Sequence, residues 1–387
     1  MSTTLSCALL GSGQQLVACA ERWLARGHRI VGVVSNCPEV SSWADARGVA
    51  RCTPDDQLRF LAREPFDYLF SIVNHSIAPA ELLALPRRLA INYHDSPLPR
   101  YAGFNATAWA ILDGQSAHAV TWHEMTASVD AGRILLQAPI EIREDDTAFT
   151  LGAKCAEAGV TSFEELTQRL ELAQQDHLSL LAPPQGASGD FHFRSDRPDL
   201  ALLDFQRPAR VLHALVRGLN FGPDDSWMCK PKLRCPGGLL VVSEAAVGNA
   251  SPEAAEPGRV LSVDESGLEI ATAEGTLRVS ELCTLEGAQV QLAELTRYGL
   301  VAGDTLQPAP RSWTDAAQQL DRTLTKHERF WVERLRDARP PQLPELTFGR
   351  QPPEPAMLRV DSPAALHSLP AAERANALLA ALVAYLA

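Results

Sequence analysis

Short apolar segments alternate with helical segments through the first 95 residues, and this alternation constrains the fold more than any other feature of the sequence. The segment LSCALLGSG at residues 5–13 is predicted to be a strand that ends in glycines, and QQLVACAERWLARGH then places apolar residues at helical spacing. A strand at HRIVGVVS completes a unit that implies parallel pairing. Further strands are predicted at residues 67–73 and 89–94. The sequence therefore predicts an α/β fold with an open, mostly parallel, Rossmann-like sheet, which binds ligands beyond the carboxyl ends of its strands.

Gly11 and Gly13 stand between the first predicted strand and helix, where a glycine turn can hold phosphate on backbone amides. The full dinucleotide fingerprint GxGxxG is missing, because residue 16 is leucine. The two glycines are therefore predicted to form a tight turn between strand and helix.

The pattern changes after residue 183, and four regions are predicted. A catalytic domain spans residues 1–183, and a linker rich in Pro, Gly and Ser spans 184–200. A small β-barrel domain spans 201–306, with one amphipathic helix over residues 202–221 and four short β segments between residues 238 and 283. A C-terminal helical segment spans 307–387.

Charge and composition exclude several classes of function. The formal net charge of −12 disfavours a nucleic-acid partner, and residues 201–305 carry nine Lys and Arg against fourteen Asp and Glu. Neither a signal peptide nor a membrane span is recognisable, so we expect a cytoplasmic protein without a membrane partner. The eight cysteines never form CxxC, and neither a metal site nor a disulfide is expected.

Two polar residues at the end of a predicted strand are the strongest candidates for a catalytic site. Residues two apart on a strand point to the same face, so Asn92 and His94 project together, and the loop SPLPRYAG ends the strand. Asp130 follows further along, just before Gly132. An amide can donate to an oxyanion, a histidine transfers protons near neutral pH, and a carboxylate can orient an imidazole or relay a proton. The three together suit acyl transfer to an amine, whereas a lone Asn-x-His is more typical of a capped loop.

A longer set of spaced elements extends this pattern: Asn92-Tyr93-His94, the loop 96–103, Trp109-Ala110-Ile111, Thr121 with His123, and Val129-Asp130-Ala131-Gly132. Over roughly the first 180 residues it resembles the signature of the folate-dependent formyltransferases. The resemblance implies that Asn92, His94 and Asp130 form the catalytic triad, with His123 as a possible helper. It also implies 10-formyltetrahydrofolate as the co-substrate and formyl donor, and a formyltransferase barrel as the second domain.

By the same resemblance, the pterin of the donor lies against the backbone of residues 70–77 and 126–129, with side-chain contacts from Phe70 and Ile77. The cofactor-binding residues expected on this basis are Phe70, Asn74, Ser76, Ile77, Thr126, Ala127 and Val129.

The loop SPLPRYAGFNATAWAIL is similar to one branch of the family, the formylation domains at the start of nonribosomal peptide synthetases. Ala102 stands where the tRNA-modifying members have arginine, and NFGPDDSWMCKPKL resembles the second domain of that branch, although residues 225–229 depart from its pattern. The segment TKHERFWVERLRDARPPQLP resembles a synthetase linker or condensation domain, and the apolar stretch from residue 369 to the end suggests either an excised piece or a docking helix.

This resemblance predicts N-formylation of an aminoacyl thioester on a carrier protein, in antibiotic or siderophore biosynthesis. The expected partners are the aminoacyl carrier protein or adjoining synthetase modules, and Arg100 is the leading candidate to meet the phosphate of the carrier arm. Three alternatives stay open: formylation of a small free amine such as hydroxyornithine or an amino sugar, hydrolysis of 10-formyltetrahydrofolate, and a non-catalytic docking module.

Overall fold

The computed structural model describes most of the first 325 residues and single positions beyond them. The described ranges are 4–173, 176–186, 191–198, 200–223, 228–248 and 255–325, with His327, Phe330 and Arg334. The chain divides into two units, Met1–Leu320 and Asp321–Ala387. The synthetase-like segment and the apolar C-terminal stretch predicted from the sequence lie almost entirely outside the described residues, which end with α8 (Arg311–Thr325) apart from those single positions.

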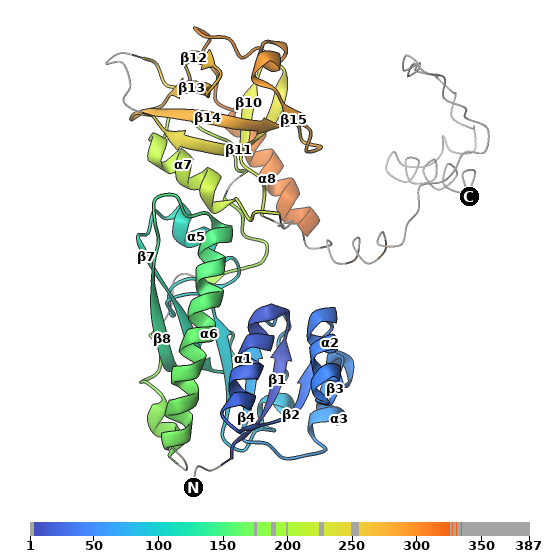
Figure 1. The fold of residues 1–387 in the computed structure, drawn as a ribbon. Helices are drawn as coiled ribbons and strands as arrows, with labels where there is room; N and C mark the ends of the chain where they lie inside the picture. Colours follow the sequence, from blue (N-terminus) through green and yellow to red (C-terminus); the bar gives the residue numbers. More distant parts are fainter. Residues whose placement is uncertain are drawn as a thin grey trace, which may run out of the picture. The chain divides into compact units, whose positions relative to one another are not determined.

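A seven-stranded sheet with the strand order β3-β2-β1-β4-β5-β7-β8 forms the first domain (Figure 1). The first five strands in this order pair in parallel, β7 runs antiparallel to β5, and β8 runs antiparallel to β7. This confirms the predicted α/β fold with a mostly parallel sheet. The bounds are β1 Ser6–Gly11, β2 Arg29–Val34, β3 Arg51–Cys52, β4 Tyr68–Ile72, β5 Leu89–His94, β7 Ala117–Glu124 and β8 Ile134–Glu141.

The turn after β1 confirms the structural interpretation of its glycines. Gly11 has φ of +135°, and a Cβ at this position would lie 1.7 Å from the carbonyl oxygen of Ile72 on the neighbouring strand. Only glycine fits so close a backbone approach. The helices of this domain are α1 Gly13–Ala25, α2 Pro38–Arg47, α3 Gln57–Leu61, α4 Ala80–Leu83, α5 Ala106–Leu112 and α6 Ala148–Ala173, with a 3₁₀ turn at Pro54–Asp56.

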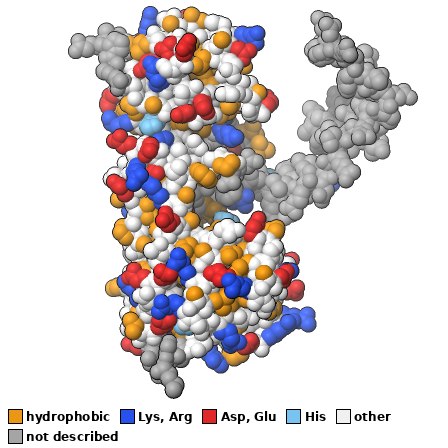
Figure 2. Space-filling model, in the orientation of Figure 1, with side chains coloured by type: hydrophobic (Ala, Val, Ile, Leu, Met, Phe, Trp, Pro, Cys, Tyr) orange, Lys and Arg blue, Asp and Glu red, His pale blue; other side chains and the backbone are white. Residues whose placement is uncertain are grey.

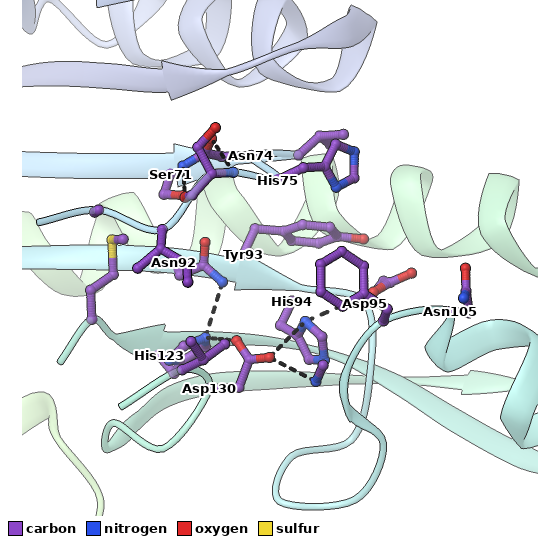
Figure 3. Close-up of a pocket in the computed structure, with 18 of the residues that line it drawn as sticks. Ser71, Asn74, His75, Asn92, Tyr93, His94, Asp95, Asn105, His123 and Asp130 are labelled. Atoms are coloured by element: carbon purple, nitrogen blue, oxygen red, sulfur yellow. Dashed lines mark hydrogen bonds and ion pairs between the residues drawn. The ribbon is translucent and has the colours of Figure 1, made fainter. Parts of the chain in front are cut away.

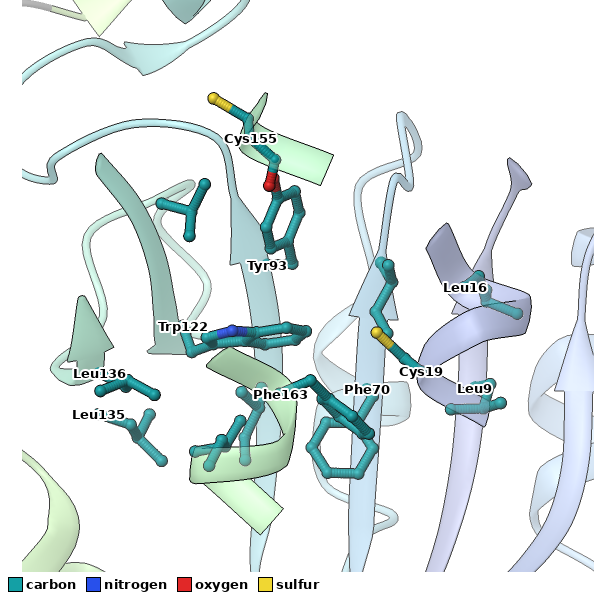
Figure 4. Packing of buried hydrophobic residues seen from close by; sticks show 14 of the residues in the cluster. Leu9, Leu16, Cys19, Phe70, Tyr93, Trp122, Leu135, Leu136, Cys155 and Phe163 are labelled. Carbon is teal, nitrogen blue, oxygen red and sulfur yellow. The ribbon is translucent and has the colours of Figure 1, made fainter. Parts of the chain in front are cut away.

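An aromatic cluster fixes the long helix α6 on the sheet (Figure 4). Phe163 of α6 is fully buried, with its ring centroid 5.1 Å from that of Phe70 on β4 and 5.3 Å from that of Trp122 on β7. Large aromatic rings bury much apolar area and prefer such edge-on or tilted contacts. The cluster joins the parallel and the antiparallel parts of the sheet under one helix.

The second domain is a curved antiparallel sheet with one helix against it. Its strand order is β10-β11-β14-β13-β12, and β15 pairs with β14, so the predicted barrel is a half-barrel. The predicted helix over 202–221 is shorter: α7 spans Ala209–Gly218, because Pro208 lacks the N–H of a helix interior and occupies the N-cap. The strands are β10 Lys232–Cys235, β11 Gly238–Val247, β12 Val260–Asp264, β13 Gly267–Ala271, β14 Thr276–Cys283 and β15 Gln289–Val290, followed by a 3₁₀ segment at Leu292–Tyr298.

The two domains share a packed boundary. Ala108 of α5 and Ala148 of α6 belong to the apolar cluster of the second domain, and the backbone N–H of Phe149 donates to the carbonyl of Asn220 at 3.0 Å.

Acidic and basic side chains are interspersed over the face of the molecule in Figure 2. Within the described part of the chain, every helix is too short or too polar to cross a lipid bilayer.

The helix α6 offers a matched test of its buried face. Leu170 is 0% exposed and Leu172, two residues on, is 83% exposed. We expect Leu170→Ala to lower the free energy of unfolding by about 2–5 kcal/mol, because it removes buried methyl groups and leaves a cavity. Leu172→Ala should change it by less than about 0.5 kcal/mol. Chemical denaturation of both variants measures this, and equal effects would contradict the burial of this face.

Candidate active site

A cavity of about 730 Å³ opens beyond the carboxyl ends of β4 and β5 (Figure 3). Its walls come from these strands, from the segments 73–78 and 125–130, and from the loop that leads into α5. This is where an open α/β sheet binds its ligands. Asn92, His94 and Asp130 all line the cavity, so the three candidate catalytic residues are brought together.

The strand β5 presents Asn92 and His94 to the cavity by its two-residue period. The intervening Tyr93 packs against Trp122, with ring centroids 5.3 Å apart, and its hydroxyl donates to the carbonyl of Cys155 at 2.8 Å. Tyr93 also borders the cavity, and its ring and hydroxyl hold the strand to the core.

The backbone sets the orientation of the His94 ring. His94 Nε2 lies 3.0 Å from the carbonyl oxygen of Tyr101, which can only accept, so Nε2 carries a proton and donates it. His94 Nδ1 then lies 3.7 Å from Asp130 Oδ2 and 3.9 Å from Asp95 Oδ1. These are ion-pair distances, longer than hydrogen bonds. Tyr101 therefore orients the ring, and Nδ1 is the nitrogen that can gain or lose a proton between two carboxylates.

His123 connects Asn92 with Asp130. Its Nδ1 lies 2.9 Å from the carbonyl of Glu124, and its Nε2 lies 3.1 Å from Asn92 Nδ2 and 3.5 Å from Asp130 Oδ1. The neutral ring accepts a hydrogen bond from the Asn92 amide through Nε2, and the protonated ring pairs with Asp130 instead. The antiparallel register, in which Asn92 lies opposite His123, produces this contact.

Asp130 is a buried carboxylate between the two histidines (Figure 3). Its side chain is 8% exposed, and its Oδ2 accepts a hydrogen bond from the backbone N–H of Gly103 at 2.9 Å. Burial raises the pKa of Asp130, but the close contact with His123, the charges of His94 and His123, and the Gly103 amide together outweigh burial and lower the pKa to about 2. Asp130 is thus ionised at neutral pH. The sequence analysis did not predict the contact of Gly103 with Asp130, because a backbone N–H donor is present at almost every position and leaves no signal in the sequence.

Six of the seven residues expected to bind the pterin line the cavity: Asn74, Ser76, Ile77, Thr126, Ala127 and Val129. Phe70 does not, because alternation along β4 turns its ring into the core, 5.3 Å from Trp23. Its neighbour Ser71 lines the cavity instead, and its buried Oγ has no hydrogen-bond partner among the described residues. The alternation of side chains along β4 would therefore have identified Ser71, in place of Phe70, as the cavity-lining residue of this strand.

Arg100 lies outside the cavity lining. Its guanidinium hydrogen-bonds Gln115 at 3.3 Å and the Tyr101 hydroxyl at 3.1 Å, and it stacks over the Tyr101 ring. Arg100 is therefore engaged on the surface of the loop, and the expectation that it meets a ligand phosphate finds no geometric support.

The lowered pKa of Asp130 links this site to stability. A carboxyl with an unfolded pKa near 3.8 and a folded pKa of about 2 stabilises the fold above pH 4, and this contribution is lost as the pH falls toward 2. We expect Asp130→Asn to lower the free energy of unfolding by about 2 kcal/mol at pH 5, and by about half as much at pH 3. Denaturation at both pH values measures this, with the exposed Asp55→Asn as a control that changes little. A difference that grows toward acid pH would contradict the assignment.

Comparison with known proteins identifies the family. Residues 61–167 match a family model described as formyl transferase, and residues 197–298 match one described as formyl transferase, C-terminal domain. Among similar solved structures is WlaRD, a sugar 3N-formyl transferase studied with dTDP and 5-N-formyl-THF (17% identity, TM-score 0.57, covering 72% of this chain and 98% of that one).

Two further structures share the fold. An N-formyltransferase from Helicobacter canadensis, in complex with folinic acid and dTDP-3-aminofucose, has 17% identity and a TM-score of 0.56, covering 72% of this chain and 99% of that one. HypX from Aquifex aeolicus, in complex with tetrahydrofolic acid, has 16% identity and a TM-score of 0.52, covering 80% of this chain and 50% of that one. The two family models together match more than half of the sequence, with one match in each domain of the described unit, and the chain belongs to the formyltransferase family.

Proposed function

We propose that this enzyme transfers the formyl group of 10-formyltetrahydrofolate to an amine. The observation that carries the proposal is the convergence of Asn92, His94 and Asp130 on one cavity of a chain in this family. The amine nitrogen attacks the formyl carbon, the bond from that carbon to N10 breaks, the amine loses a proton and N10 gains one. Tetrahydrofolate and the formamide are the products.

The three side chains have separate roles in this reaction. An amide carries two N–H donors, so Asn92 can hydrogen-bond His123 with one and stabilise the oxyanion of the formyl group with the other. His94 takes the proton of the amine on Nδ1, because Nε2 is held by Tyr101. Asp130 stays ionised and stabilises the protonated His94. With a pKa of about 2, Asp130 serves better as a charge partner than as the proton relay expected from the family resemblance.

The residues on one side of the cavity fit the pterin of the donor. Ile77 lines the cavity although the residue is 80% exposed, and a large apolar side chain at a cavity rim is a surface that a ligand ring can cover. The buried Ser71 Oγ, without a partner among the described residues, can hydrogen-bond a pterin nitrogen. Leu83 and Met125 add apolar walls.

The proposed acceptor is the α-amino group of an aminoacyl thioester on a carrier protein. Among the described residues, the cavity lining contains no lysine or arginine, while Phe104, Phe191, Phe193 and Phe221 supply an aromatic wall. The arm of a carrier protein is uncharged over many bonds next to the amine, so it suits such a wall. A nucleotide-linked amino sugar brings a diphosphate to within a few bonds of its amine, where cationic partners are favourable.

An amino sugar is the second candidate acceptor. Similarity over 72% of this chain to two sugar N-formyltransferases, one of them in complex with dTDP-3-aminofucose, favours it. Both candidates present a primary amine to the same catalytic residues, so they differ in the recognition of the rest of the acceptor.

Removal of either polar side chain of β5 should stop the chemistry while the protein stays folded. We expect Asn92→Ala and His94→Ala each to lower kcat by at least about a hundredfold, since each removes an oxyanion donor or an acid-base group. An assay with 10-formyltetrahydrofolate labelled in its formyl group, followed by chromatographic detection of the labelled formamide, measures kcat. The thermal unfolding temperature of each variant checks that it is folded. A folded His94→Ala enzyme with wild-type turnover would refute the assignment.

A panel of acceptors distinguishes the candidates. We expect formylation of aminoacyl carrier protein, detected as a gain of one formyl group by mass spectrometry, with little dependence on salt. Methionyl-tRNA should not react, because its binding needs a track of Lys and Arg. Faster turnover of a dTDP-amino sugar than of every aminoacyl carrier would establish the second candidate instead.

A further inference from the structure

The segment between the two domains reaches back into the catalytic site. We call five of its described residues, Gln185, Gly186 and 191–193, the strap. Phe191 and His192 form the short strand β9 (Phe191–His192), which pairs in parallel with β6 (Ala102–Gly103) in the loop after β5. Phe191 and Phe193 both line the cavity. A stretch with the composition of a linker is thus part of the wall of the site.

The strap contacts Asp130 from the side of its backbone. Gln185 Nε2 donates to the carbonyl oxygen of Asp130 at 3.1 Å and also to the carbonyl oxygen of Gly132. Asp130 has φ of +51°, which lies in the left-handed region. This conformation is unfavourable for any residue other than glycine. The surroundings have to hold such a residue in place. The side-chain amide of Gln185 donates to both carbonyls of this turn and thereby helps to hold Asp130 in this conformation.

The strap also fixes the partner of the Asp130 carboxylate. The backbone N–H of Phe104 donates to the carbonyl of His192 at 2.9 Å, directly after Gly103, whose own N–H donates to Asp130 Oδ2. A Cβ on Gly103 would lie 2.2 Å from the His192 carbonyl oxygen, so the two chains are in close contact here.

The side chain of His192 anchors this contact. Its ring stacks on Trp109 of α5 with centroids 4.3 Å apart and an angle of 7° between the planes, and it lies 6.2 Å from the ring of Tyr101 at 13°. The carbonyl of Tyr101 in turn orients His94. One strap residue therefore packs against the loop that positions both His94 and Gly103.

We propose that the strap is a positioning element of the active site, in which Gln185 holds the backbone of Asp130 and His192 holds the loop of Gly103, so that the Asp130 carboxylate faces His94 and His123. This inference rests on the proposed function, because it assigns Asp130 a part in formyl transfer. It makes Gln185 and His192 positioning residues, which act through Asp130 and the loop and do not touch the reacting atoms.

The test replaces Gln185 with an apolar side chain of similar length and reads the position of Asp130 without using activity. In protein labelled with [15N]glycine, the chemical shift of the Gly103 amide reports its hydrogen bond to Asp130. The Asp130→Asn variant assigns this resonance and gives its chemical shift when the contact is altered. We expect Gln185→Leu to move the Gly103 resonance in the direction of the Asp130→Asn value. Gln206→Leu, at an exposed glutamine outside the strap, is the matched control and should leave it unchanged. An unmoved Gly103 resonance in folded Gln185→Leu protein would overturn the proposal.

Turnover gives the second reading. We expect Gln185→Leu and His192→Ala each to lower kcat about tenfold or more with little change in the KM for the folate donor. In the Asp130→Asn background, Gln185→Leu should cause little further loss, because its effect passes through Asp130. An equal loss in both backgrounds would show a general structural role and overturn the proposal. If no acceptor is formylated by the wild-type enzyme, the proposed function fails while the resonance test still decides the placement of Asp130.

Discussion

The buried carboxylate of Asp130 sets the conditions that the rest of the site has to meet. A charge removed from water is stable only where hydrogen bonds and opposite charges replace the solvent. Here the Gly103 amide, His94 and His123 do so, and together they outweigh the effect of burial on the pKa of the carboxyl. Each of these partners comes from a different segment: the strand β5, the strand β7, and the loop before α5. The carboxylate therefore joins three separate parts of the chain at one point.

The change of strand direction between β5 and β7 makes this arrangement possible. Because β7 runs antiparallel to β5, His123 lies opposite Asn92, and the chain after β7 returns along the edge of the cavity to deliver Asp130. A parallel strand would need a crossover helix and would leave this side of the sheet by another route. The aromatic cluster of Phe70, Trp122 and Phe163 joins the parallel and antiparallel parts, so the spacing between Asn92 and His123 depends on the core as well as on hydrogen bonds across the strands.

Period and composition predict the parts of this protein that depend on local sequence. The alternation of strands and helices predicted the sheet, and the two-residue period placed Asn92 and His94 on one face. The same period would have excluded Phe70 from the pterin site, where family resemblance alone included it. Contacts made by backbone atoms, such as the Tyr101 carbonyl to His94 and the Gly103 amide to Asp130, leave no mark on residue type. The strand β9 inside a stretch of linker composition escaped prediction because its pairing partner lies almost ninety residues earlier. The assignments of catalytic roles stay predictions.

The negative charge of the cavity has two consequences for an amine acceptor. The α-amino group of the proposed acceptor has an ordinary pKa of about 7.7–8.0, so at neutral pH most of it would enter as the ammonium ion, which the carboxylates of Asp95 and Asp130 would attract. Attack on the formyl carbon requires the lone pair of the nitrogen, so a proton has to leave first. Asp130 is a poor acceptor for it, since its pKa is about 2. His94 Nδ1, at 3.7 Å and 3.9 Å from the two carboxylates, is placed to accept it, and the carboxylates then stabilise the protonated ring. The same two carboxylates thus stabilise the ammonium ion when it enters the cavity and the protonated ring of His94 after the proton has moved.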